Sequence, residues 1–436
     1  MVLQSSASSG AKRSVWRQLA FRFGVVYVAL YSAATQILGG VLLLPGFQLP
    51  ALGTVWPMRD ITLALAQRVF GLTPPLLYTG NSGDTAFHWI QNAWLLVVAV
   101  AAASIWAALD RQRNHTALRV WFRVFLRFAL AAQMFYYGMA KIVPTQFPPP
   151  GLVTLIEPVG HASLSDLLWT FIGASLPYQV FTGCAELLAG LLLLSPRTTT
   201  LGALIGVADM AQVFVLNMTY DFGLKQISFH LLVMFLWLLA PELRRLADVL
   251  VFNRATSPVM HPPLFASARS NRLALMTQLA FGAYLLVMFS TLSVRYYYAA
   301  GGPGSEKSPL YGIWNVEQLS VNDDVRPAAL NDYDRRWRRV VFDAPNVVVF
   351  QRTDDSLAHY GAAIGDGGRT LALTKRNSKT WSARFTVERP APDRLVIAGE
   401  MDNRRISMQL QRVELDTFRL LRSTFRWIRP PDPFAG

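Results

Sequence analysis

Apolar and polar positions divide this chain into two regions. From Met1 to Gly304 long apolar runs dominate, whereas from Ser305 to Gly436 charged residues recur every few positions. Because a bilayer core of about 30 Å is crossed by roughly 20 apolar residues in a helix, the first region predicts about seven membrane spans. Six stretches qualify and one more is less clear, and together they cover residues 19–44, 87–109, 119–142, 178–194, 200–218, 228–243 and 273–294.

Between the first two spans, residues 61–72 show helical periodicity with charged residues on one side. This pattern predicts an interfacial helix rather than a crossing one.

The distribution of lysine and arginine predicts the orientation of the spans. Cytoplasmic loops are enriched in these residues, and the loops alternate between many and few of them when the N-terminus is placed inside. The chain is therefore expected in a bacterial inner membrane, with its C-terminal domain in the periplasm. The inner set is Lys12, Arg13, Arg17, Arg22, Arg111, Arg113, Arg119, Arg123, Arg197, Arg244, Arg245, Arg254, Arg269 and Arg272, and the outer set is Arg59, Arg68, Lys141, Lys225 and Arg295.

Charge and cysteine content narrow the function classes. The net charge is +14, and residues 305–436 hold 21 of the 41 Lys and Arg but 17 of the 27 Asp and Glu, so the excess lies in the membrane region. That placement indicates a lipid bilayer as partner and argues against nucleic acid. The single cysteine, Cys184, excludes a disulfide framework or a thiolate metal site, and we interpret it as a small buried thiol.

Polar groups at membrane depth mark the candidate site. They are costly there, so each is a functional hypothesis. Glu186 and Asp209 lie deepest, and the cations available to them are Lys141 and Lys225. The alternative is a polar cluster that fixes helix packing without chemistry. Besides Lys141 and Glu186, the candidate ligand-binding residues are Asp84, His88, Tyr137, Gln146, Asp209, Gln212, Asn217, Tyr220, Asp221, Lys225 and His230.

Two expectations concern the geometry of these residues. Asp209, Gln212 and Asn217 are spaced so that they could share one helical stripe facing a polar cavity. His88 and His230 have no second ligand at metal-binding spacing on their own helices, so we expect hydrogen-bonded histidines and no metal.

Several motifs together resemble the DoxX/DoxD-like membrane proteins. They are the lysine that ends a span followed by a proline-rich segment (141–150), the glycine-flanked glutamate (183–190), the Arg-Thr-Thr-Thr turn (197–202) and the segment 217–225. The resemblance covers residues 122–246 and implies a four-helix core and an association with quinone-linked or thiol-redox systems. A more distant similarity, to the membrane domain of vitamin K-dependent carboxylase-like proteins, implies that Lys141 is a base toward a reduced naphthoquinone, with Glu186 beside it as a catalytic candidate. No cofactor motif is evident in the sequence, and a quinone is the one cofactor that the resemblance implies.

The C-terminal region has the period of two that is typical of strands. Seven short strands are predicted, separated by turn signals such as 343–346, 366–368 and 402–403, and they suggest a small barrel or sandwich. The opening 310–314, with Gly312 and Trp314, and the late Arg426-Trp427 resemble a lipocalin-type barrel, in which an arginine near the end packs over the tryptophan. The strands are expected at 312–319, 338–342, 347–352, 370–375, 381–388, 394–399 and 404–412.

The resulting organisation is a cytoplasmic N-terminus (1–18), a helical membrane domain (19–298), a linker (299–309) and an extracytoplasmic β-domain (310–436). Two functions are compatible with it. The first is an accessory component of a redox system that binds a small apolar ligand between helices at the outer face, together with a redox partner protein. The second is a non-enzymatic scaffold or carrier whose barrel captures a periplasmic ligand. A transporter is disfavoured because no inverted repeat of broken helices is found, and the sequence leaves open whether the protein is an enzyme.

Overall fold

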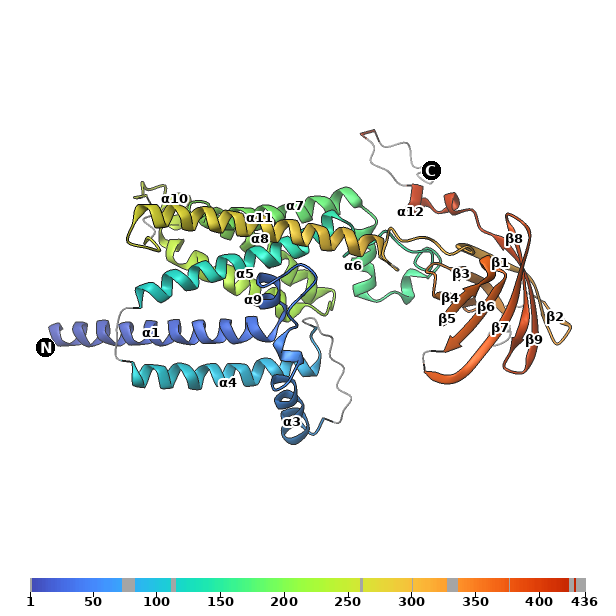
Figure 1. Ribbon diagram of the computed structural model, residues 1–436, viewed down its shortest axis with the longest axis horizontal. Coiled ribbons are helices and arrows are strands. Elements are labelled where there is room, and N and C mark those ends of the chain that lie inside the picture. Colours follow the sequence, from blue (N-terminus) through green and yellow to red (C-terminus); the bar gives the residue numbers. More distant parts are fainter. Residues whose placement is uncertain are drawn as a thin grey trace. The chain divides into compact units, whose positions relative to one another are not determined.

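A computed structural model describes residues 2–72, 83–110, 115–258, 262–299, 301–327, 336–375, 377–422 and 427–428. A helical region is followed by strands (Figure 1). The helices are α1 (Val2–Ala34), α2 (Gln36–Val41), α3 (Met58–Phe70), α4 (Ala86–Leu109), α5 (Thr116–Ile142), α6 (Leu164–Gly173), α7 (Leu176–Leu193), α8 (Thr199–Thr219), α9 (Lys225–Leu239), α10 (Leu243–Leu250), α11 (Ala268–Tyr298) and α12 (Arg419–Arg422). The strands are β1 (Gly312–Val321), β2 (Asp324–Arg326), β3 (Trp337–Phe342), β4 (Val347–Arg352), β5 (Leu357–Gly365), β6 (Thr370–Lys375), β7 (Ser378–Ala391), β8 (Arg394–Met401) and β9 (Arg404–Arg412).

The chain is a multi-pass membrane protein. Within the described residues five helical segments are long and apolar enough to cross a bilayer: α4, α7, α8, α9 continued into α10, and α11. The other two predicted spans are also helical, as α1 and α5. The first differs from its prediction, because α1 begins well before residue 19 and ends at Ala34. Thr35 is extended, and the separate helix α2 follows it.

Helix α5 packs at the centre of the bundle, and its arginines bond the ends of its neighbours. The Arg127 side chain is buried and donates from Nε to the Leu193 carbonyl at 2.7 Å and from Nη1 to Gln278 Oε1 at 3.0 Å. Arg123 likewise donates to the Leu238 carbonyl in the last turn of α9, at 3.1 Å. Carbonyls at the end of a helix have no amide partner within it, and positive charge there is favourable. The charges on α5 therefore hold helix ends within the bundle.

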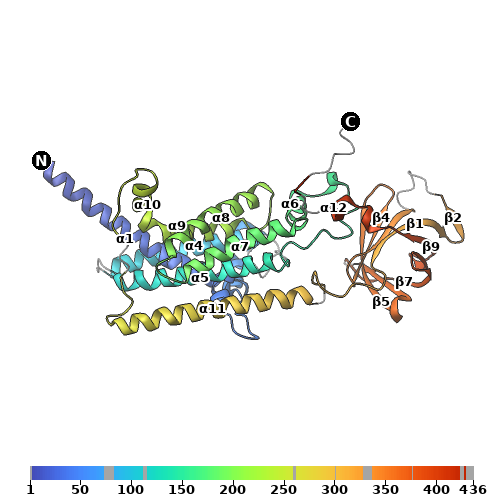
Figure 2. The ribbon, with the colours of Figure 1, turned by 90° about the horizontal axis from the view of Figure 1, so that it is seen from above.

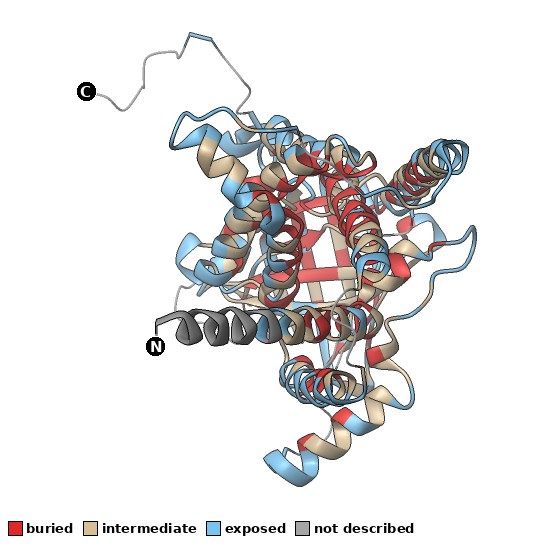
Figure 3. Cartoon of the chain, turned by 90° about the vertical axis from the view of Figure 1, so that its left-hand side faces the viewer, coloured by how far each residue is buried: buried red, intermediate tan, exposed pale blue. Residues whose placement is uncertain are grey.

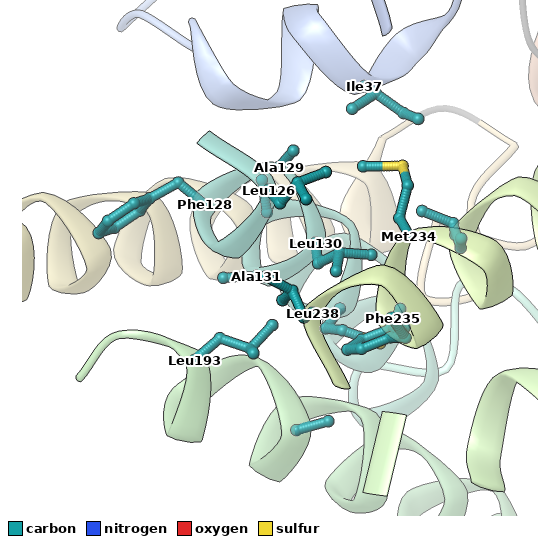
Figure 4. Packing of buried hydrophobic residues seen from close by; sticks show 14 of the residues in the cluster. Ile37, Leu126, Phe128, Ala129, Leu130, Ala131, Leu193, Met234, Phe235 and Leu238 are labelled. Carbon is teal, nitrogen blue, oxygen red and sulfur yellow. The ribbon is translucent and has the colours of Figure 1, made fainter. Parts of the chain in front are cut away.

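The core of the membrane unit forms around the same helix. Buried side chains gather on the faces that helices turn toward one another (Figure 3). Leu126 and Leu130 of α5 pack with Met234 and Phe235 of α9, and Ile37 of α2 closes the cluster (Figure 4). α5 contributes more buried side chains to this unit than α9 or α2, so it offers the most buried positions for a functional group.

The C-terminal strands form a closed antiparallel barrel. Strands β1 and β3 to β9 pair in chain order, β1 also pairs with β9, and the short β2 extends one side of β1. Eight strands enclose just enough space for side chains to fill. The fully buried Trp314 lies in this core and donates from its indole nitrogen to the Leu310 carbonyl at 3.0 Å.

The barrel unit also contains a segment from the first half of the chain. Residues 147–179 form one compact unit with residues 295–436. Leu152 and Ile156 pack on outward-facing residues of β1, β3 and β4, namely Ile313, Val341 and Val349. We call residues 147–158 the strap. Burial of its two apolar side chains contributes about 1.5–3 kcal/mol each.

Two hydrogen bonds fix the strap to the strands. The amide of Leu152 donates to Asp343 at 2.9 Å, and the side chain of Gln351 donates to the carbonyl of Ile156 at 3.2 Å. A Cβ atom at Gly151 would lie 2.4 Å from the Asp343 carboxylate, so the close approach requires glycine. Burial raises the pKa of Asp343, although its bonds to strap amides oppose this shift.

The predicted barrel is confirmed, and β4, β6 and β9 have their predicted bounds. Strands β2 and β5 were missed, and β7 is longer than expected. The predicted packing of Arg426 over Trp314 concerns a residue outside the described ones. Among the described residues, Arg389 of β7 lies over the Trp314 ring, at 6.0 Å.

Candidate functional site

Helices α5 and α7 approach so closely that only glycine fits between them. A Cβ at Gly183 would lie 2.8 Å from the carbonyl oxygen of Gly138, and a Cβ at Gly138 would lie 2.9 Å from that of Gly183. Small residues at membrane helix crossings allow this approach. Lys141 and Glu186 each follow one of these glycines by three residues, so the crossing brings their side chains to the same place.

Lys141 and Glu186 form a buried ion pair. The lysine Nζ lies 2.6 and 2.7 Å from the two carboxylate oxygens, and the side chains are 9% and 2% exposed. The ring of Tyr137, one turn before the lysine, lies 5.8 Å from Nζ. The predicted meeting of Lys141 and Glu186 is confirmed. The pair lies in a place from which water is largely excluded.

A second carboxylate belongs to the same electrostatic cluster. Asp209 of α8 interacts with the charges of both Glu186 and Lys141, and its Oδ2 is buried without a hydrogen-bond partner among the described residues. The Oε1 of Gln146, just beyond the end of α5, is also buried and unpartnered there. Unmet hydrogen-bonding capacity of this kind is uncommon in folded proteins and suggests a ligand or water.

The candidates near α9 form a separate arrangement that holds helices together. The Asp84 carboxylate accepts from the backbone amides of Lys225 and Gln226, at 2.7 and 3.0 Å, and so caps the start of α9. The side chain of Lys225 bonds the exposed Asp221 at 2.7 Å. This bond lowers the pKa of Asp221. We assign these groups a structural role.

Both candidate histidines are hydrogen-bonded, as the sequence predicted. His230 donates from Nδ1 to the Gln226 carbonyl at 2.6 Å, and its Nε2 accepts from the Tyr27 hydroxyl at 2.7 Å. Tyr31 stacks on the same ring, with centroids 3.7 Å apart. His88 bonds the Thr85 hydroxyl at 2.8 Å. Within the described ranges no three His, Cys, Asp or Glu side chains are grouped as metal ligands.

Two expectations about individual positions were wrong. Gln212 is exposed and does not share a buried stripe with Asp209 and Asn217. Five residues separate Gln212 from Asn217, which rotates it about 140° around the helix. Cys184 is exposed rather than buried, because it lies on the opposite side of α7 from Glu186.

The remaining candidates contribute to packing. Asn217 donates to the Leu224 carbonyl and the Ser228 hydroxyl. Tyr220 is half-buried at the end of α8. The segment 80–82, which was grouped with Asp84, lies outside the described residues.

The sequence reasoning missed a polar path that leads to the ion pair. Gln36 of α2 donates to Gln133 at 2.8 Å and to the hydroxyl of Tyr137 at 2.9 Å. Gln133, Tyr137 and Lys141 are spaced four residues apart on α5, so they lie on one face. That spacing was visible in the sequence and could have identified Gln133.

On the barrel, an open hollow of about 520 Å³ lies over strands β5 to β8. Small residues such as Ala372 and Ala398 line it, together with Phe385 and one cation, Arg384. Its volume is in the range of small-molecule sites.

Comparison with known proteins gives one family relationship. A stretch of 128 residues, 29% of this chain, is 38% identical to the uncharacterized protein YwoB of Bacillus subtilis and covers 79% of that protein. The chain belongs to the YwoB family. No family model matches the chain, and no solved structure matches it. YwoB is described as uncharacterized, so membership of its family brings no activity to this chain.

Proposed function

We propose that this protein is a DoxX-like accessory component of a quinone- or thiol-linked redox system in a bacterial inner membrane. It binds a small apolar molecule with a polar head between helices near Lys141, Glu186 and Asp209, at the outer face. The observation that carries the proposal is the buried Lys141–Glu186 pair with the unpartnered Asp209 carboxylate beside it.

The energetic cost of this arrangement supports a function. Desolvating two charges costs several kcal/mol per ion, and an apolar pair of the same size would often be as stable or more so. Ionisable residues in membrane segments are therefore functional candidates by default. Lys141 can donate hydrogen bonds, whereas the free oxygens of Asp209 and Gln146 can accept them.

A quinone head matches this set of donors and acceptors. Its carbonyl oxygens accept hydrogen bonds, and the hydroxyls of the quinol donate them. Conversion of one to the other takes up two electrons and two protons. The chain has a single cysteine, so the electrons come from a partner redox protein, and the cluster supplies and recovers protons through Lys141 and Asp209.

Photo-crosslinking tests this proposal. The full chain in nanodiscs is irradiated with a naphthoquinone that carries a photoreactive tail, and the labelled peptides are mapped. We expect labelling of α5, α7 and α8, and a loss of roughly tenfold or more in Lys141→Met/Glu186→Met. The matched control, Lys375→Met/Glu400→Gln, removes one lysine and one glutamate from the barrel and should label as the parent does.

If the folded double variant labels as strongly as the parent, the pair serves packing alone and the proposal fails.

The hollow on the barrel favours a second candidate function, a carrier that captures a small ligand outside the membrane. Filling it by Ala372→Trp should abolish binding of an apolar fluorescent probe, while Arg404→Gln, at an exposed position of β9 outside the lining of the hollow, should leave it unchanged. Equal probe binding by both variants would exclude the hollow as the site.

A further inference from the structure

The short helix α10 follows the end of α9 and carries an exposed apolar surface. α10 follows the span α9 after only three residues, which form a 3₁₀ turn (Ala240–Glu242). The helical segment that begins at Lys225 continues through this turn to Leu250, and its last part, residues 242–250, contains four charged residues. The connection therefore holds α10 at the depth where a span leaves the hydrocarbon.

Helix α10 has two chemically different faces. Leu243, Leu246 and Leu250 lie on one side, whereas Arg244 and Arg245 lie on the other, as the 3.6-residue period requires. This apolar side is only partly covered: Leu246 packs against the membrane core, whereas Leu243 is 52% exposed and Leu250 70% exposed.

The segment after the helix extends the exposed apolar surface. Val251 and Phe252 are 72% and 57% exposed, so three consecutive apolar residues (250–252) point away from the protein. Such a surface would be unfavourable in water. The guanidinium of Arg254 lies 5.3 Å from the Phe252 ring, which places a cation directly beside this apolar tip.

Aromatic residues mark the same depth on a neighbouring helix. Trp121, in the second turn of α5, contacts Phe265 edge to face at 6.0 Å, and both rings are partly exposed. Tryptophan is enriched at the headgroup level of membranes. These residues place the polar–apolar boundary at this end of the bundle.

The charges around α10 select the type of lipid. Arg244 makes no ion pair within the part of the chain that the structure describes, whereas Arg245 lies 3.6 Å from the Glu242 carboxylate. Arg244 and Arg254 thus present cations above exposed apolar side chains. This combination binds anionic lipid surfaces, since apolar residues enter the acyl boundary while arginines bond phosphate.

We propose that α10 and residues 251–254 form an interfacial site for anionic phospholipid, in which Leu250, Val251 and Phe252 insert at the acyl boundary while Arg244 and Arg254 hold the headgroup phosphate. The occupant is the bilayer that already surrounds the neighbouring span. The site is independent of the Lys141 cluster and of the proposed redox role.

A fluorescent probe at position 250 tests the proposal. Cys184→Ser removes the single native cysteine, and Leu250→Cys then carries an environment-sensitive label on the full chain. The protein is reconstituted in vesicles of phosphatidylcholine alone or of phosphatidylcholine and phosphatidylglycerol in equal parts. We expect blue-shifted emission that deepens with phosphatidylglycerol. Arg244→Gln/Arg254→Gln should lower the apparent affinity for that lipid roughly fivefold per arginine, from about 1 kcal/mol each.

A matched control separates headgroup binding from net charge. Arg369→Gln/Arg404→Gln removes two exposed arginines from the barrel and should titrate as the parent does. Circular dichroism checks that each variant is folded. Water-like emission in every vesicle, as expected if this surface awaits a protein partner or a second copy, would overturn the proposal. Emission that responds neither to phosphatidylglycerol nor to the double variant would overturn it as well.

Discussion

The Lys141–Glu186 pair makes a quantitative prediction about stability. Lys141→Met removes the only cation within 4 Å of the Glu186 carboxylate in the described structure and leaves that carboxylate buried, with a side chain that is 2% exposed. Breaking a buried pair by removing one partner costs about 3–5 kcal/mol. We expect a loss of that size in the free energy of unfolding, measured by denaturant titration in detergent micelles.

The double variant distinguishes pairing from other effects of the lysine. Lys141→Met/Glu186→Met removes both charges and fills the space with apolar atoms. We therefore expect its free energy of unfolding to lie within about 1 kcal/mol of the parent's value or to exceed it. The control Asp221→Asn, which breaks the exposed pair with Lys225, should change stability little because that pair is screened by solvent. The single variant Glu186→Met completes the comparison. If the stability losses of Lys141→Met and Glu186→Met add up to the loss in the double variant, or if Lys141→Met alone is neutral, the two groups are not a dehydrated pair.

Two further predictions concern close packing. Gly183→Ala should destabilise the protein by about 1–3 kcal/mol, because the new methyl group would lie 2.8 Å from the Gly138 carbonyl, whereas Gly223→Ala, which meets nothing within 4 Å, should be tolerated in the same unfolding assay. In the barrel unit, burial raises the pKa of Asp343, so its contribution to stability is complete below the ordinary aspartate pKa of about 3.9 and is lost as the pH rises through the folded-state value. Between about pH 3.9 and the folded-state pKa, the thermal unfolding temperature of Asp343→Asn should therefore depend less on pH than that of the parent. Parallel plots of unfolding temperature against pH for the two proteins would contradict the raised pKa of Asp343.

Much of the helical architecture follows from the hydrophobic pattern. All seven predicted spans coincide with helices, because apolar runs of membrane length have few alternatives. The break at Thr35 was not predicted, since Ala33 and Ala34 precede it, the apolar pattern resumes at Ile37, and no proline or glycine stands next to it.

The β-domain shows where period-two reasoning stops. β4, β6 and β9 begin and end where they were predicted. β6 and β9 alternate apolar and polar residues, whereas β4 is a short apolar run between turn signals. β5 was missed because its core-facing residues include Ala358 and Ala362, which are too small to give a strong hydrophobic signal.

For the candidate site, the sequence predicted which charges would meet but not which polar groups would remain apart. Lys141 and Glu186 were paired because hydrocarbon offers them no other partners. Asp84 and Lys225 were wrongly grouped with that site. The Asp84 carboxylate instead caps α9, and this could not be predicted because the cap depends on a contact between residues 141 positions apart in the sequence.

The strap affects how this protein can be made and dissected. Ile156 leaves the ribosome 195 residues before Gln351, the side chain that bonds its carbonyl. During that interval Leu152 and Ile156 have no strands to cover them, so the nascent protein exposes an adhesive patch that a chaperone or the membrane surface must shield. A chain truncated before the strands would expose these two side chains permanently. Aggregation of such a shortened protein would therefore result from the uncovered strap and would not show that the barrel has a function of its own.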